Sequence, residues 1–177
     1  MNDSLFSVKG KVIIITGGGQ GIGEFLALGL SKNGATVYCI DKKFKKGQKK
    51  YRGLNKILCD ITKLDEIKST CSEIIKSNKK IDVLINNAGT VYTGYMLDRS
   101  DEELENMINV NFTSMIYTIR SFMPAMLEKN KGHIINISSA SSLIGAPKLA
   151  IYAATKWAVM GLTESLRLEA IKMGKKG

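Results

Sequence analysis

Short apolar runs alternate along the chain with longer amphipathic segments. The run KVIIIT at 11–16 is rich in β-branched residues and lacks polar alternation, which is typical of a parallel strand covered on both faces. From 21 to 33 apolar residues recur at helical spacing, and Gly34 follows as a left-handed stop. Further strands are predicted at 36–40, 56–59, 81–86 and 133–138, and further helices near 63–77, 100–127 and 149–173.

This alternation predicts the fold class and the place of any ligand. Strands that alternate with helices form a parallel sheet with right-handed crossovers, so the expected fold is α/β, a three-layer doubly wound sheet. Ligands of such sheets bind at the carboxyl ends of the strands. The sequence has no internal repeat and no Pro/Gly-rich linker, and we expect one domain over residues 1–177.

Composition narrows the class of protein. Hydrophobic residues make up 44% and charged residues 24% of the chain, as in ordinary globular domains. The three cysteines, Cys39, Cys59 and Cys71, lack the paired spacing of a zinc site or a disulfide framework, which favours a reducing, cytoplasmic compartment. No uncharged apolar run approaches the roughly 18 residues that suggest a membrane span. Neither export nor membrane insertion is therefore expected.

The net charge of +10 leaves two interpretations open. Positive potential attracts polyanions, so a patch for an acidic partner is possible. Most lysines, however, are scattered among acidic neighbours, and we interpret most of the charge as solvated surface without a nucleic-acid partner. The densest cluster comprises Lys42, Lys43, Lys45, Lys46, Lys49, Lys50 and Arg52.

A glycine-rich turn, TGGGQGIG at 16–23, joins the first strand to the first helix. Gly17, Gly21 and Gly23 permit positive φ and let a pyrophosphate approach the backbone, where the unpaired N–H groups of the helix face it. The spacing GxxxGxG departs from the GxGxxG fingerprint of many dinucleotide folds. A tight turn that binds nothing is the alternative.

Acidic and amide residues follow the next three strands. Asp41 ends the second strand, where a carboxylate can accept hydrogen bonds from the adenosine ribose, which favours NAD over NADP. The neighbouring Lys42 and Lys43 could instead neutralise a 2′-phosphate, and Asp41 could simply cap the loop. Asp60 and the segment 86–89 are candidate adenine and ribose contacts, although Asp60 could equally cap the following helix.

Tyr152 and Lys156 stand four residues apart at the start of the last helix and so share one face. A free phenol has a pKa of about 10, and one ammonium at about 4 Å supplies about 4 kcal/mol toward ionising it in an effective dielectric near 20. Ser138 and Ser139 end the fifth strand, where a hydroxyl could orient a carbonyl. Alone, each signal is weak, because Tyr–Lys pairs at this spacing are common on helix surfaces and serines are common at strand ends.

The single histidine, His133, is interpreted as structural, so neither a hydrolase triad nor a metal site is expected.

Together these motifs resemble the short-chain dehydrogenase/reductase family over residues 9–173. They are TGxxxGxG at 16–23, NNAG at 86–89, Asn111, Ser139 and YxxxK at 152–156. The resemblance implies a Rossmann fold, with Tyr152 as general acid/base, Lys156 stabilising its phenolate, Ser139 holding the substrate oxygen and Asn111 positioning a water. It also implies a cofactor site made of Gly17, Gly21, Ile22, Gly23, Asp41, Asp60, Asn87, Ala88, Gly89, Tyr152 and Lys156.

The resemblance implies a hydride transfer between NAD(H) and a small apolar secondary alcohol or ketone, in a homodimer or homotetramer. One alternative is a 3-oxoacyl carrier-protein reductase that uses NADPH, because the positive charge would attract an acidic carrier. Another is a non-catalytic dinucleotide-binding scaffold. Family members usually continue after this helix with a sixth strand and a substrate loop, so the chain is expected to lack the C-terminal third and to leave the fifth strand at an edge.

Overall fold

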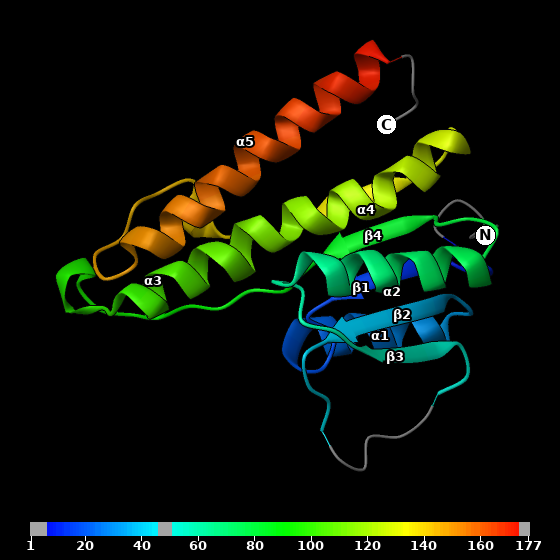
Figure 1. Ribbon diagram of the computed structural model, residues 1–177, viewed down its shortest axis with the longest axis horizontal. Coiled ribbons are helices and arrows are strands. Elements are labelled where there is room, and N and C mark those ends of the chain that lie inside the picture. Colours follow the sequence, from blue (N-terminus) through cyan, green and yellow to red (C-terminus); the bar gives the residue numbers. More distant parts are fainter. Residues whose placement is uncertain (1–6, 46–50, 174–177) are drawn as a thin grey trace.

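The computed structural model describes residues 7–45 and 51–173, which form a five-stranded parallel sheet with helices on both faces (Figure 1). The strands are β1 (Val12–Thr16), β2 (Thr36–Asp41), β3 (Leu54–Leu58), β4 (Val83–Asn86) and β5 (His133–Asn136), in the order β3-β2-β1-β4-β5. The chain thus winds outward from β1 in both directions, and the predicted doubly wound fold is confirmed.

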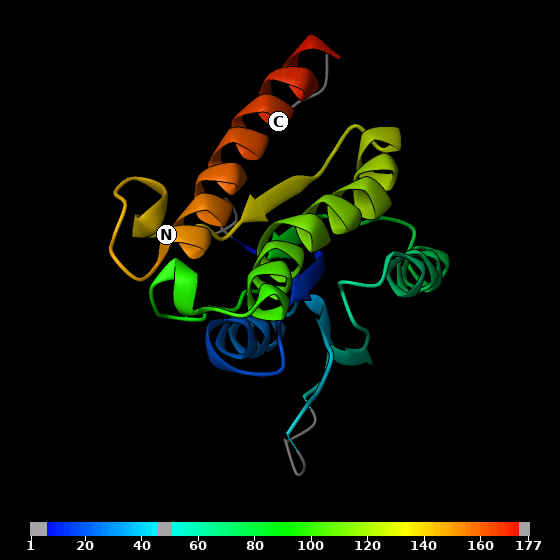
Figure 2. The ribbon, with the colours of Figure 1, turned by 60° about the vertical axis from the view of Figure 1, so that its left-hand side comes forward.

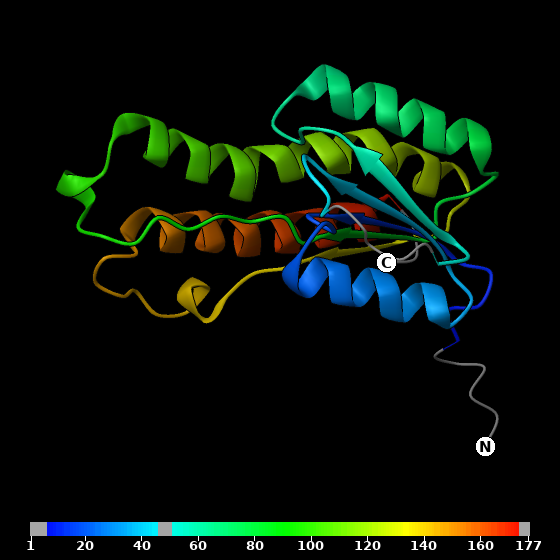
Figure 3. The same ribbon diagram turned by 90° about the horizontal axis from the view of Figure 1, so that it is seen from below.

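Two layers of helices bury the two faces of the sheet. The helices α2 (Leu64–Ser77) and α4 (Ser114–Glu128) cover one face, and α1 (Gly21–Lys32) covers the other (Figure 3). The last helix, α5 (Ala150–Lys172), packs through Val159 on the same core as α4. Successive side chains of β1 point to opposite faces. Ile14 therefore packs with Phe122 in the core under α4, whereas Ile13 and Ile15 pack in the core under α1.

The predicted helix at 100–127 is observed as one continuous helical run with a π-helical segment inside it. A capping box of Ser100 and Glu103 starts α3 (Asp101–Ile108), the π-helix η3 (Asn109–Thr113) follows, and α4 begins directly at Ser114. In Figure 1, α3 and the start of α5 extend beyond the sheet on one side. The shorter 3-10 helices are η2 (Met96–Asp98) and η4 (Ala140–Ser142).

The fifth strand is shorter than predicted. Ile137 N still donates to Asn86 O at 2.9 Å, but Ser138 and Ser139 lie beyond the strand because Ser139 caps the turn η4 instead. β5 forms one edge of the sheet, and α4 and α5 diverge beside it toward their C-terminal ends (Figure 2). An apolar groove of about 340 Å³ lies between them. Across residues 7–45 and 51–173, we find no helix with the length and apolar character needed to cross a bilayer.

Candidate active site

The glycine turn between β1 and α1 is closely packed against the ends of the neighbouring strands. Gly17 has φ +67° and Gly21 has φ +57°, which glycine adopts without strain. A Cβ on Gly17 would lie 2.7 Å from Ala88 Cα, and one on Gly23 would overlap Gly17 O. The backbone conformation therefore requires glycine at Gly17 and Gly21, and the lack of space for a side chain requires it at Gly17 and Gly23.

Two further glycines are as constrained and were not singled out by the motif. A Cβ on Gly18 would overlap the Cys39 side chain, and one on Gly19 would overlap Lys43 O. The signal in the sequence was the run of three consecutive glycines at 17–19, of which the GxxxGxG pattern uses only the first. Gly18 and Gly19 therefore pack against β2 and the residues that follow it.

Asn87 and Thr16 fasten the turn to the end of β4. Asn87 Nδ2 donates to Thr16 O at 3.1 Å and to Gly17 O at 3.2 Å. Thr16 Oγ1 accepts the backbone N–H groups of Asn87 at 3.1 Å and Ala88 at 3.2 Å. Sequence reasoning identified Asn87 and missed the role of Thr16, although it begins the motif.

Asp41 lies where the sequence places it, and its carboxylate organises the surrounding loop. Oδ2 accepts Gly19 N at 2.8 Å, and Oδ1 accepts Lys43 N at 3.2 Å. The side chain thereby joins the end of β2 to the glycine turn, as the loop-capping interpretation expects. It is only partly buried and also faces the cavity described below, so both interpretations agree with its position.

Asp60 shapes the turn after β3 rather than capping α2. Its Oδ1 accepts Thr62 N at 3.0 Å and Thr62 Oγ1 at 2.7 Å, and the N-cap of α2 is Lys63. Burial raises the pKa of Asp60, but these two hydrogen bonds, with the nearby Lys42 and Lys63, hold it below its ordinary value. Asp60 is therefore a carboxylate at neutral pH.

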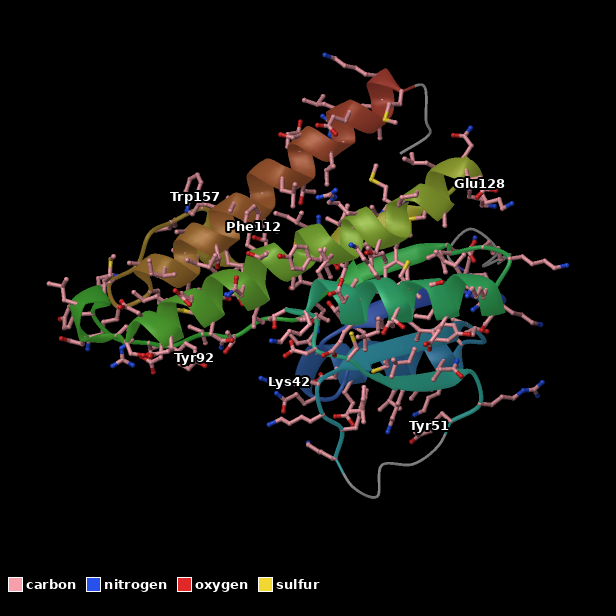
Figure 4. The ribbon with its side chains drawn as sticks, viewed as in Figure 1. Lys42, Tyr51, Tyr92, Phe112, Glu128 and Trp157 are labelled. Atoms are coloured by element: carbon pink, nitrogen blue, oxygen red, sulfur yellow. The ribbon has the colours of Figure 1, made fainter. Side chains whose placement is uncertain are left out.

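A cavity of about 500 Å³ opens at the carboxyl ends of the strands. Lys42 and Tyr92 both lie on this side of the molecule (Figure 4). Within the described part of the chain, the side chain of Gln20 does not cap α1, and Gly21 and Ile22 of the first turn of this helix line the cavity. A glycine turn, a helix N-terminus facing the cavity and a carboxylate at the end of β2 fit a nucleotide cofactor. The predicted residues that line the cavity are Gly17, Gly21, Ile22, Asp41, Asp60, Asn87, Ala88 and Gly89.

Asn111 lies in the π-helix and is fully buried. Its Oδ1 accepts Thr90 N at 2.7 Å, while Nδ2 donates to Thr90 O at 2.9 Å and to Thr155 Oγ1 at 3.2 Å. All three bonds hold the side chain between the segment after β4 and the first turns of α5. The role of Thr155 was not recognised from the sequence motifs.

Lys156 and Tyr152 lie on the first turns of α5, as predicted. Lys156 is 4% exposed, and its Nζ lies 5.7 Å from the centroid of the half-buried Tyr152 ring and donates to Ile137 O at 3.0 Å. Burial lowers the pKa of Lys156. A Cβ on Gly89 would lie 3.5 Å from Asn111 Oδ1 and 3.8 Å from Lys156 Nζ, so these three residues meet at one point.

Ser139 joins this group less directly. Its Oγ accepts Ser141 N at 3.2 Å, and its carbonyl accepts Ser142 Oγ at 2.6 Å, which folds the loop after β5 into η4. The neighbouring Ser138 Oγ donates to Lys156 O at 3.2 Å and so ties this loop to α5. His133 is exposed at the amino end of β5, away from the carboxyl ends of the strands. Among residues 7–45 and 51–173, no cluster of three or more His, Cys, Asp or Glu side chains is arranged to hold a metal ion.

Comparison with known proteins places this geometry in a family. Residues 11–174 match the family model described as short chain dehydrogenase. The chain is 41% identical over 170 residues to dehydrogenase/reductase SDR family member 6 of Rattus norvegicus, covering 94% of the chain and 68% of that protein. It also resembles the ligand-free aldohexose dehydrogenase of Thermoplasma acidophilum, with 33% identity and a TM-score of 0.84 over 92% of the chain and 62% of that structure. The structure of ElxO with NADP bound has 30% identity and a TM-score of 0.86 over 92% of the chain and 69% of its own.

Proposed function

Because the chain belongs to the short chain dehydrogenase family, whose members are nicotinamide-dependent oxidoreductases, we propose that it transfers a hydride between NAD(H) and a secondary alcohol or ketone. The observation that carries the proposal is the meeting of Asn111, Lys156 and Gly89 beside Tyr152. This cluster adjoins the cavity, which Gly89 also lines, so the proton-transferring groups lie next to the proposed cofactor site.

Tyr152 is the proposed acid/base. When the dinucleotide is bound, its nicotinamide supplies or accepts the hydride. In the oxidation direction Tyr152 Oη takes the hydroxyl proton as the hydride leaves the carbinol carbon, and in reduction it returns a proton to the oxygen. Ser139 holds that oxygen, and Asn111 orients a water toward Lys156.

Lys156 supplies the positive charge. Its ammonium is buried, and a charge in a low-dielectric site acts more strongly on a neighbouring phenol than an exposed one does. One of its three N–H groups is used by Ile137 O, which fixes the side chain and leaves N–H groups for the ribose hydroxyls of the nicotinamide. The same residue therefore serves both substrate protonation and cofactor binding.

The proposed cofactor is NAD. Gly17, Gly21, Ile22 and Gly23 would hold the pyrophosphate, and Asp41 would accept hydrogen bonds from the adenosine ribose. A carboxylate at this position disfavours a 2′-phosphate, because the two negative charges repel each other. Lys42 and Lys43 also line the cavity, so a direct comparison of the two dinucleotides is needed.

The proposed substrate is a small apolar alcohol or carbonyl compound. The loop after β4 exposes Tyr95, Met96 and Leu97, and the loop after β5 exposes Leu143 and Ile144. These loops are joined where Gly94 N donates to Lys148 O at 3.0 Å, so both lie at the carboxyl ends of their strands and adjoin each other. The apolar surface favours an apolar substrate.

We further propose a homodimer or homotetramer. The outer surface of α5 carries exposed Trp157, Met160, Leu168 and Ile171, and Trp157 points away from α4 in Figure 4. Large exposed apolar side chains on one helix favour burial against another copy. Sedimentation velocity of the wild type and Trp157→Asp compares the two states. Loss of the larger species in the variant is expected, and a monomeric wild type would contradict the assignment.

The activity is tested by following absorbance at 340 nm with panels of alcohols and ketones. Tyr152→Phe removes the proposed proton donor and should lower kcat at least about 100-fold. Tyr117→Phe, a hydroxyl removed from α4, is the matched control and should retain activity. Full activity of Tyr152→Phe would overturn the proposal. Binding of NAD without any turnover would favour the scaffold alternative, and turnover of an acyl carrier substrate with strong salt dependence would favour the reductase alternative.

A further inference from the structure

Two polar connections join α5 to the long helix formed by α3, η3 and α4. Each ends on a threonine of α5, the first on Thr155 and the second on Thr163. The sequence motifs assign neither residue a part in the chemistry. Their geometry nevertheless bears on the place of Tyr152, because both lie on the helix that carries it.

The first connection is short and buried. Thr155 is 4% exposed, and its hydroxyl donates its single proton to Tyr152 O at 2.7 Å. The same oxygen accepts Asn111 Nδ2 at 3.2 Å. The side chain of Asn111 is thus linked through one hydroxyl to the backbone of Tyr152 itself.

The second connection crosses two strands. Thr118 Oγ1 donates to Asn86 Oδ1 at 2.6 Å, Asn86 Nδ2 donates to Asn136 Oδ1 at 2.9 Å, and Asn136 Nδ2 donates to Thr163 Oγ1 at 2.9 Å. Thr163 Oγ1 donates in turn to Val159 O at 2.6 Å. Asn86 and Asn136 are direct partners in the register of β4 and β5. Thr118 Oγ1 also lies 2.9 Å from Met115 O, so that carbonyl competes for its single proton. From Asn86 to Val159 all the donors point in one direction, an arrangement in which hydrogen bonds strengthen one another.

The spacing of the two connections fixes how far α5 is advanced along its axis. Thr155 and Thr163 are eight residues apart, and Asn111 and Thr118 are seven apart, which is about two helical turns in each case. A slip of α5 by one turn would break both connections at once, leaving the buried amide of Asn111 without Thr155 and the partly exposed amide of Asn136 without Thr163. Such groups are costly to leave unpaired, so the helix is held in one register.

We infer that Thr155 is a positioning residue, which holds Tyr152 in register with Asn111, and that the chain ending on Thr163 secures the same register two turns further on. The inference rests on the proposed function, since it concerns the place of the proposed acid/base. Thr155 touches neither substrate nor cofactor in this scheme; it acts through Tyr152 and Asn111.

Steady-state kinetics of Thr155→Val and Thr155→Ser test the inference. Valine keeps the shape and removes both hydrogen bonds, so kcat should fall about tenfold, while KM for the dinucleotide changes less than about twofold. Serine restores the hydroxyl and should recover most of kcat. Ser165→Ala, a hydroxyl removed from an exposed position on α5, is the control. An unchanged kcat in Thr155→Val, or a serine variant no better than valine, would overturn the inference.

Hydrogen exchange supplies a readout that does not need turnover. In Thr155→Val the amides at 153–156 should exchange at least about tenfold faster than in Ser165→Ala, and Thr163→Val should accelerate the same amides even though it does not contact Asn111. Equal protection in all variants would refute the positioning role. If the wild-type protein turns over no substrate but the exchange pattern appears, the proposed function fails while the register argument stands.

Discussion

Asp82 is a buried carboxylate just before β4, and its replacement tests how the sheet is held together at the end away from the site. Its Oδ2 accepts Val12 N at 2.8 Å, and Lys80 Nζ lies 2.9 Å from the same oxygen. Lys11 Nζ lies 3.8 Å from Oδ1. The side chain thereby takes the place of a backbone acceptor at the start of β1, one residue before the β4 ladder begins.

The expected cost of Asp82→Ala follows from these contacts. Leaving the buried Val12 N–H without its acceptor costs about 1–3 kcal/mol. The side chains of Lys80 and Lys11 are 48% and 35% exposed, so their ion pairs add less than about 1 kcal/mol. We expect a loss of about 2–3 kcal/mol in the free energy of unfolding. Asp82→Asn retains an acceptor for Val12 N and should cost about 1 kcal/mol.

The stabilisation by Asp82 should depend on pH. Burial raises the pKa of Asp82, but the bond from Val12 N and the charges of Lys80 and Lys11 outweigh it and hold the pKa below its ordinary value. A lowered folded-state pKa means that the unfolded chain binds the proton first, so the stabilisation is complete above the ordinary pKa of about 3.9 and is lost as pH falls through the folded value.

Urea unfolding followed by circular dichroism at pH 7, 5 and 3 measures the effect, with Asp98→Ala, an exposed carboxylate, as the control. The gap between the wild type and Asp82→Asn should narrow at the lowest pH. An Asp82→Ala variant within about 0.5 kcal/mol of wild type at pH 7, or a gap to the asparagine variant that does not change with pH, would refute the reasoning.

Three further predictions concern the cofactor site and its surroundings. Asp41→Ala should weaken NAD binding about tenfold or more and raise the relative affinity for NADP in calorimetry, and an unchanged preference would argue against a ribose contact. Gly17→Ala places a Cβ 2.7 Å from Ala88 Cα at φ +67°, so it should lower stability by about 1–3 kcal/mol and weaken dinucleotide binding; wild-type affinity and stability would contradict this packing. Burial raises the pKa of Cys39 to about 12, so its thiol should react with Ellman's reagent at pH 8 only as fast as the protein opens, and rapid labelling of folded protein would disprove its burial.

Most of the fold was predictable because its helices and strands carry strong signals in the local sequence. The β-branched run of β1, the glycine turn after it and the capping box at Ser100 each combine a strong periodic or capping signal with a boundary residue. The strand ends were less predictable. β5 stops at Asn136 because the Ser139 side chain accepts a hydrogen bond from Ser141 N and starts a turn. This side-chain bond competes with the backbone hydrogen bonds of the sheet, and the pattern of apolar residues does not reveal it.

The site was predictable as a set of positions but not as a network. Spacing alone put Tyr152 and Lys156 on one helix face, whereas the contribution of Thr16, Gly18 and Thr155 depends on which segments meet in space. Those meetings join residues far apart in the sequence, and no local pattern encodes them.

The π-helix that holds Asn111 makes the site sensitive to chain length as well as to chemistry. Each residue of an α-helix turns the backbone by about 100° about the helix axis. The one extra residue within η3 therefore rotates α3 by about 100° relative to α4. Deleting a single position between 109 and 113 would let the segment relax into uninterrupted α-helix and rotate the Asn111 side chain away from Thr90, although no other residue of the site is changed. Insertions and deletions in this stretch should therefore be far less tolerated than point substitutions at its exposed positions.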